Sequence, residues 1–348
     1  MFEQRLVQEA RLLASTYPKE YRKEYTEAAE RVRLPVWDYA SSLAGEYGYP
    51  PFLTKDTLTI HRTASGDTDV EIQNPFQSYT LPIRTSTSPD IALNVSDPGI
   101  NPKTYLAGQH TVRYPIGNST FTESQTSDYD AANEKLKEVI PTCVQTRVHA
   151  LLSAQEGSST YQCFLNGNMP TTSCNSEERN IALDRIHSYA HEMMAGSPWV
   201  GHPYVGTISN TAPYGNPTQA YDPAFHILHV SMDMHHAIWQ RLNPETKLTN
   251  ALDIPAPGSI YTRLGGGMVS NETDLTPFWK DFRFSNKYLN SNDVWNHRDL
   301  GYEYETLEES GSNKAKLLEA VNALYGGSGN TIADCEYDLG FGFVSEEI

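Results

Sequence analysis

Histidines are concentrated in one part of this chain. Of its 11 histidines, seven fall within about fifty residues: His187, His191, His202, His226, His229, His235 and His236. His187 and His191 are four residues apart, so a helix would place both imidazoles on one face, about 5 to 6 Å apart at Cβ. Such a pair can hold one metal ion. Isolated pairs of this kind are also common as solvated or core histidines, so the spacing alone leaves both interpretations open.

A second polar stripe follows in the segment 222–240. Its members recur at spacings of three, four and three: His226, His229, Asp233 and His236. Asp222 can cap a helix that begins at Pro223. Either the stripe is satisfied by water and neighbours, or it faces the first pair in a helix bundle, with three neutral imidazoles on one metal and a carboxylate behind them. Imidazole ligands suit copper, zinc, nickel or iron, so the spacing does not name the metal.

The elements that must position these residues are helices. Apolar residues recur at helical spacing in seven segments: residues 3–16, 18–32, 131–140, 147–154, 180–195, 223–242 and 313–325. Between residues 34 and 128 only Leu58–Ile60 and Val70–Ile72 alternate as strands do. A loop rich in Gly, Pro, Asn and Thr, Gly196–Tyr221, separates the two histidine segments. The sequence therefore predicts a mainly α fold, in which a helix-bundle core carries the metal site amid long irregular loops and a few short strands.

Charge and hydropathy exclude two classes of partner. The chain has 348 residues, 26 Lys plus Arg, 43 Asp plus Glu and a formal net charge of −17. A nucleic-acid-binding surface is basic, so we do not expect nucleic acid as a partner. No stretch approaches the roughly 18 apolar residues of a membrane span, so no membrane is expected as a partner either.

The compartment, the cysteine pairing and the oligomeric state stay open at this point. The N-terminal segment MFEQRLVQEARLLAS carries charges where a secretory signal would be apolar, so no signal peptide is visible. Three glycosylation sequons begin at Asn94, Asn118 and Asn271. We therefore give secretion and the cytoplasm about equal weight. Four cysteines are too few for a disulfide scaffold, and their pairing is not assigned: Cys143, Cys163, Cys174 and Cys335.

Several motifs occur in a fixed order along the chain. They are His187 and His191, Gly201-His202, Asp222-Pro223-Ala224-Phe225, His229, Asp233 and Trp239-Gln240, with the flanking pieces Leu34–Tyr39, Asn74-Pro75-Phe76 and Gly301–Tyr304. In these motifs the chain resembles the tyrosinase, catechol oxidase and hemocyanin family of type-3 copper proteins, and within it the fungal tyrosinase-like branch. The resemblance covers most of residues 1–325, which we expect to form one copper-binding domain, and leaves 326–348 as a C-terminal tail.

The resemblance implies a copper oxidoreductase and the residues of one of its two metal sites. His187, His191 and His229 match the ligands of the family's second copper, and Asp233 would orient a ligand from behind. No catalytic residue is assigned. The implied reaction is the oxidation of o-diphenols or o-aminophenols to quinones, so the expected partners are a small phenolic substrate and dioxygen. Ser188 stands where Asn or Asp is common in efficient phenol hydroxylases, which disfavours a monophenolase.

The family's first copper site has no counterpart in the motifs of this chain. In the family, three further histidines lie upstream of a helix that corresponds to Phe2–Leu6, so we expect the type-3 copper fold to be N-terminally incomplete here. His61, His110 and His149 fall outside the family's ligand positions and are expected in loops or in the core. Two alternatives stay open. One is a binding or structural derivative with one metal or none, and the other is a zinc hydrolase on the same histidines with Glu192 as base.

Overall fold

The fold is described from a computed structural model, and the chain divides into two compact units. The first unit comprises Met1–Leu34, Glu156–Tyr161 and His236–Leu317, and the second comprises Pro35–Gln155, Gln162–His235 and Leu318–Ile348. A single domain over residues 1–325 stays a prediction. The structure describes residues 2–62, 68–80, 93–95, 103–105, 110–114, 127–157, 159–167, 171–195, 219–246, 254–255, 268–276, 278–280, 287–327 and 329–336.

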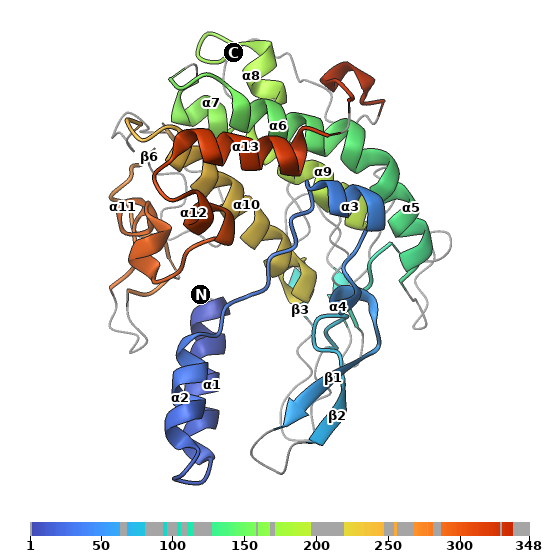
Figure 1. Ribbon diagram of the computed structural model, residues 1–348, viewed down its shortest axis with the longest axis vertical. Coiled ribbons are helices and arrows are strands. Elements are labelled where there is room, and N and C mark those ends of the chain that lie inside the picture. Colours follow the sequence, from blue (N-terminus) through green and yellow to red (C-terminus); the bar gives the residue numbers. More distant parts are fainter. Residues whose placement is uncertain are drawn as a thin grey trace. The chain divides into compact units, whose positions relative to one another are not determined.

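Helices dominate the described residues, as the sequence predicts (Figure 1). The first unit contains α1 (Phe2–Thr16), α2 (Arg22–Glu30), β5 (Ile254–Pro255), β6 (Met268–Val269), α11 (Ser291–Val294) and α12 (Glu305–Ser310). The second contains α3 (Ser42–Tyr47), α4 (Pro51–Thr54), β1 (Thr57–Arg62), β2 (Thr68–Gln73), β3 (Leu93–Val95), β4 (Lys103–Tyr105), α5 (Tyr129–Val139), α6 (Gln145–Ser153), α8 (Ser176–Asn180), α9 (Leu183–Ala195) and, apart from its first residue, α7 (Tyr161–Leu165). Helix α10 (Pro223–Leu242) begins in the second unit and ends in the first, and α13 (Lys314–Tyr325) does the reverse.

In the first unit, α1 and α2 form a helical hairpin (Figure 1). The small residues Ala14 and Ala29 are buried and allow the two helices to approach closely. An ion pair joins them, with Arg11 Nη2 2.6 Å from Glu30 Oε2. Both helices agree with the predicted segments 3–16 and 18–32, although the second begins only at Arg22.

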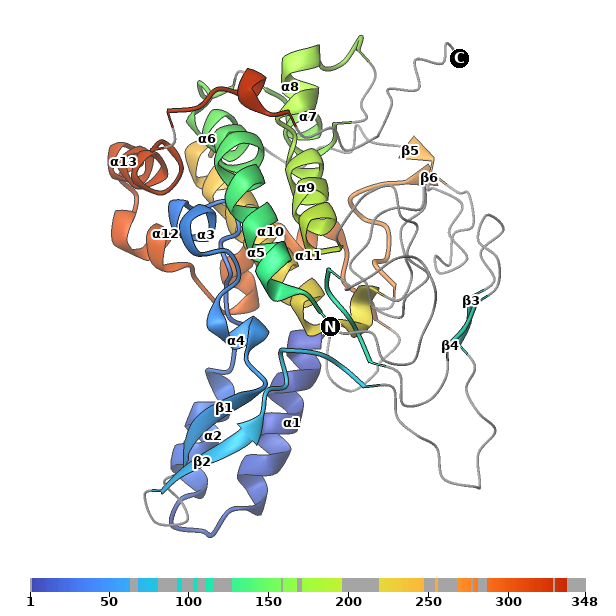
Figure 2. The same cartoon turned by 90° about the vertical axis from the view of Figure 1, so that its right-hand side faces the viewer.

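In the second unit, one long helical run crosses a proline. Helices α5 and α6 are joined by a five-residue π-helical turn, Ile140–Val144. Pro141 has no N–H to donate to the preceding turn, and a widened turn accommodates it without breaking the helix. The sequence predicts two separate helices here, and the structure makes them continuous. Helices α3 and α9 pack beside this run (Figures 1 and 2).

The two short strand patterns form a hairpin, as predicted. Strands β1 and β2 pair antiparallel, from Thr57 opposite Gln73 to Arg62 opposite Thr68 (Figure 2). The sequence missed α3 and α4 because six and four residues are too few for a helical period. Local signals hold them nonetheless: the Ser41 hydroxyl accepts from the backbone N–H of Ala44, and Pro51 occupies the first turn of α4.

The start of α10 is tied to a buried ion pair. Asp222 Oδ1 accepts the N–H of Ala224, which confirms Asp222 as the cap. The same carboxylate accepts from Arg113 Nε at 3.0 and 3.1 Å and from Nη2 at 2.7 Å, and both residues are 0% exposed. The guanidinium also donates to the carbonyls of Leu53 and Phe76, each at 2.6 Å. Burial acts to lower the pKa of Arg113, but the charge and hydrogen bonds of Asp222 raise it above its ordinary value.

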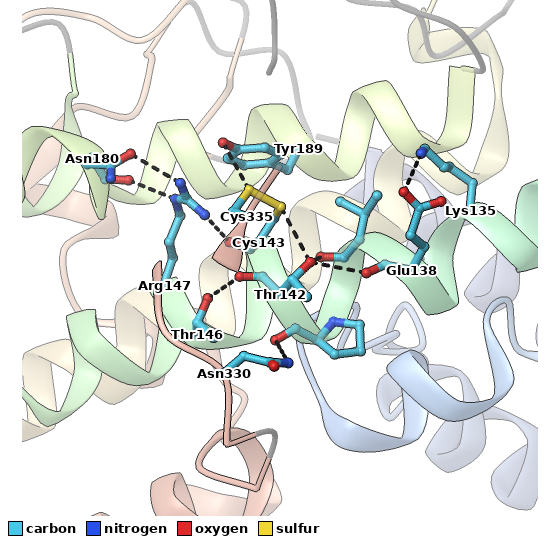
Figure 3. The surroundings of a disulfide bond; sticks show 12 residues. Lys135, Glu138, Thr142, Cys143, Thr146, Arg147, Asn180, Tyr189, Asn330 and Cys335 are labelled. Atoms are coloured by element: carbon cyan, nitrogen blue, oxygen red, sulfur yellow. Dashed lines mark hydrogen bonds and ion pairs between the residues drawn. A yellow bond between two sulfur atoms is a disulfide. The ribbon is translucent and has the colours of Figure 1, made fainter. Parts of the chain in front are cut away.

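All four cysteines are paired in two disulfides, which settles the pairing left open by the sequence. Cys163 bonds to Cys174, 11 residues away, and Cys143 bonds to Cys335, 192 residues away (Figure 3). In the loop-closure treatment, links of these lengths remove about 3 and about 5 kcal/mol of unfolded-state entropy. The long link fastens the segment around Cys335 to the π-helical turn, where Asn330 also donates to the Pro141 carbonyl.

None of the helices in the described residues is long and apolar enough to cross a membrane.

Replacing Arg113 with Met should lower the free energy of unfolding by about 3–5 kcal/mol, because Asp222 would remain buried without its counter-charge. Urea denaturation followed by circular dichroism measures this. Lys135→Met is the matched control, since it removes a cation whose partner Glu138 has a side chain 67% exposed; we expect a loss below about 1 kcal/mol. Equal losses in both variants would contradict the role given to Arg113.

Candidate metal centre

Three histidines from two helices converge in the second unit. His187 and His191 lie on α9, and His229 lies on α10. His187 Nε2 is 2.6 Å from His191 Nε2 and 2.9 Å from His229 Nε2. All three candidate ligand atoms lie within 4.8 Å of one another. The predicted ligand set is therefore brought together in space, while metal binding by it stays a prediction.

The two helices hold these side chains within a buried environment. On α9, Ile186, Ala190 and Met193 are at most 1% exposed, and His191 is itself only 2% exposed. On α10, Ile227 and Leu228 are fully buried beside His229. The contact between His187 and His229 joins the two helices at the site.

A hydrogen bond fixes which ring nitrogen of neutral His229 carries the proton. Its Nδ1 lies 2.6 Å from the Phe225 carbonyl and donates to it, so that Nε2 of the neutral ring carries a lone pair. A hydrogen on His187 Nε2 could point to only one of its two neighbouring nitrogens, whereas a metal ion accepts all three lone pairs. Metal–nitrogen bonds of about 2.0–2.1 Å in tetrahedral geometry separate ligand nitrogens by about 3.3 Å, so a metal would open the two short contacts by roughly 0.4 to 0.7 Å. The donor set therefore fits a metal ion.

Burial favours the neutral form of His187 and of His229. Burial, followed by the charge of His229, lowers the pKa of His187 to about 3. Burial also lowers the pKa of His229, which the Phe225 carbonyl opposes in part. Neutral imidazole is the form that binds metals, so the site is ready for a cation at neutral pH.

Phe225 forms an aromatic wall beside the site. Its ring centroid lies 4.1 Å from that of His229 and 5.8 Å from that of His191. In the sequence, Phe225 is identified only as part of a motif, and its position four residues before His229 is the signal that could have placed it on the same helix face. Ser188, whose hydroxyl donates to the Asp184 carbonyl, is turned to the backbone of its own helix.

The other histidines and acids of interest lie apart from this group. Asp233 is half-buried one turn beyond His229, and its ligand-orienting role stays a prediction. Of the remaining histidines in the described residues, none joins the triad: His61 contacts Asp69, His149 contacts Asn322, His226 contacts the Ala220 carbonyl, His235 contacts Asp38, His297 contacts Glu303, His110 bridges to Thr80 and His236 packs on Trp295. His202 lies outside the described residues.

Glu192 lies on α9 and is buried without joining the group of three histidines. It is 1% exposed, and its burial raises its pKa to about 7. Its carboxylate oxygens are not among the mutually close ligand atoms found in the described part of the chain. The zinc-hydrolase alternative, which needs Glu192 as a base at the metal, therefore gains no support from the geometry.

The chain is similar in sequence to fungal tyrosinases. Tyrosinases of Aspergillus fumigatus and Podospora anserina are each 26% identical to it, over 94% of this chain and 54% and 51% of their own lengths. A Neurospora crassa tyrosinase is 27% identical, again over 94% of this chain and 43% of its own length. The chain thus spans about half the length of the curated relatives it matches.

Solved tyrosinase structures share the fold. Recombinant mushroom tyrosinase superposes with a TM-score of 0.67 at 19% identity, over 92% of this chain and 50% of that one. An Aspergillus oryzae pro-tyrosinase variant gives 0.65 at 18% identity, over 93% and 57%. These likenesses confirm the predicted type-3 copper fold.

A family match spans both helices that carry the three histidines. Residues 1–242 match the family described as the common central domain of tyrosinase. That stretch is more than half of the chain and includes the whole site from His187 to His229. Together with the shared fold, this match establishes that the chain belongs to the tyrosinase family.

Proposed function

We propose that this chain holds one copper ion through His187, His191 and His229 and so forms the second-copper half of a tyrosinase-type oxidoreductase. The substrates would be o-diphenols or o-aminophenols, oxidised to quinones with dioxygen. The observation that carries the proposal is the convergence of three imidazole Nε2 atoms from two helices of a tyrosinase-family chain. Three imidazoles leave a metal position open for a ligand.

Residues of this chain have defined tasks in the proposed reaction. Copper, when bound, supplies the exchange of electrons with dioxygen and with the phenolic ring. The Phe225 carbonyl holds His229 in the tautomer that binds through Nε2. The Phe225 ring offers an apolar face against which an aromatic substrate can stack, and it keeps water from two imidazoles. Ser188 presents no amide or carboxylate to the site, which favours diphenols over monophenols.

A single-metal derivative of the family is the second candidate. Within the described residues, one group of histidines is close enough to hold a metal, whereas the reaction in this family uses two coppers with three imidazoles each. A chain with one such site would bind a metal and a small ligand without rapid turnover. Both candidates predict one copper per chain and slow catechol oxidation by the chain alone, so they are distinguished by whether a segment that supplies three further histidines raises the rate.

Replacing His191 with Ala should reduce copper from one atom per chain to near zero after dialysis, because two imidazoles with no third partner bind weakly. Atomic absorption on the folded protein measures the ratio. His149→Ala is the control, since that ring contacts Asn322 outside the triad, and it should keep one atom per chain. Full copper retention by the His191 variant would remove the proposed site.

The copper-loaded 348-residue chain should oxidise catechol no faster than a mononuclear copper–imidazole complex, because one site offers half of the ligands that the reaction uses. Oxygen consumption measures the rate. Fusion to a segment that supplies three further histidines should raise it. A fast rate in the unfused chain, abolished by His191→Ala, would contradict the single-site count.

Replacing Asp233 with Asn should weaken copper affinity about 10- to 100-fold, the usual effect of removing a carboxylate behind a ligand. Competition with a chelator measures the dissociation constant. Asp130→Asn makes the same charge change at an exposed position of α5 and should leave affinity unchanged. Identical constants for the two variants would assign Asp233 to solvation of the α10 surface.

A further inference from the structure

The face of α9 opposite the metal-binding histidines contacts a buried cation. Arg147 of α6 is 4% exposed, and within the described residues no carboxylate pairs with it. Its charge is held by neutral acceptors: Nη1 donates to the Cys143 carbonyl at 2.7 Å, Nε to the Asn180 carbonyl at 3.2 Å and Nη2 to the Asn180 side-chain oxygen at 3.3 Å. Burial lowers the pKa of Arg147, which shows that the charge is not fully compensated.

Tyr189 completes the surroundings of this cation. It lies between His187 and His191 in sequence and is therefore turned away from them by the helical period. Its ring centroid is 4.8 Å from Arg147 Cζ, within the range of a cation–π contact. Its hydroxyl lies 3.8 Å from Cys335 Sγ, so the ring is held between the guanidinium and the Cys143–Cys335 disulfide (Figure 3).

These contacts restrain α9 in two ways, in its position along its axis and in its rotation about that axis. Asn180 is the last residue of α8 and lies three positions before α9 begins at Leu183, so the hydrogen bonds to Asn180 fix where α9 starts along its axis. The contact with Tyr189 fixes how α9 is rotated about that axis. Both contacts lead to the same side chain on α6, and α6 packs against α9.

We infer that Arg147 and Tyr189 are positioning residues that set the rotation of α9 and hence the metal affinity of its two histidines. The inference rests on the proposed metal-binding function. An imidazole Nε2 reaches roughly 6 to 7 Å from a helix axis, so a rotation of about 10° moves it by about 1 Å. Ligand distances tolerate about 0.2 Å, so a small rotation is enough to lose a ligand.

Core packing alone does not account for this choice of residues. A Leu or Met would fill the space beside Tyr189 without the cost of burying a charge. In the described part of this unit the other buried arginine is Arg113, which has Asp222 as its counter-charge, whereas Arg147 has none among the described residues. Compared with an apolar side chain of similar volume, a guanidinium adds directional hydrogen bonds and a planar face that stacks on a ring. Both interactions restrict the orientation of their partners.

Three variants test this inference on the full chain. Arg147→Met keeps the aliphatic part of the side chain and removes the guanidinium. Tyr189→Leu removes the aromatic ring, and Tyr189→Phe keeps it. We expect the first two to weaken Cu2+ binding about 10- to 100-fold, the range for residues that orient ligands, and to alter the copper hyperfine splitting in electron paramagnetic resonance. Tyr189→Phe should stay within about twofold of the parent, since the contact with Arg147 is retained. Combining the first two changes should add little, because they remove one interaction.

Asn322→Ala is the matched control for lost stability. It removes the hydrogen bond to His149, which lies on the same helix as Arg147, without changing a residue of α9. It should lower the melting temperature and leave the copper dissociation constant and the electron paramagnetic resonance spectrum unchanged. Arg147→Lys keeps the positive charge without the guanidinium and replaces the Met variant in the test if that variant does not fold. It too should weaken copper binding. The inference would be overturned by a folded Arg147 variant whose copper dissociation constant and electron paramagnetic resonance spectrum match those of the parent. Failure of the parent itself to bind copper would instead overturn the proposed function.

Discussion

The enclosed ion pair between Arg113 and Asp222 is the constraint on which the metal-bearing part of the second unit depends. One carboxylate both neutralises the guanidinium and caps α10. The guanidinium in turn gathers the carbonyls of Leu53 and Phe76, from segments far apart in sequence. Asn, Ser or Thr could cap the helix but would leave the cation uncompensated. The acid before Pro223 therefore serves two requirements that no other capping residue meets.

The site follows from that anchor and from a second one behind α9. Asp222 sets where α10 begins, and His229 stands two turns further along it. The π-helical turn and the residues around it support α9 from the other side. The three histidines therefore lie on two helices that are each supported by packing behind them, and the Phe225 carbonyl holds His229 in addition. This is the arrangement expected of ligands on rigid elements.

The clustered histidines, the longer helices and the β-hairpin could be predicted because each has a local pattern with a known period. The i, i+4 pair and the Asp-Pro start of α10 are visible within about twenty residues. Arg113 could not be found, since nothing near it in sequence indicates that its partner stands 109 positions away. The positions of the four cysteines in the sequence likewise do not indicate that Cys143 pairs with Cys335. Pro141 suggested a helix end, and the tolerance of a wide turn for a missing N–H overrode that signal.

The link from Cys143 to Cys335 encloses both helices that carry the triad within one covalent loop. Its consequence concerns how the protein is made and loaded. Where thiols stay reduced, the loop is open, and before the chain folds four thiols compete with the imidazoles for the same metal pool. Thiolates are softer ligands and prefer cuprous ions. Oxidation should therefore precede metallation, and material from a reducing host should be refolded under oxidising conditions before copper is added.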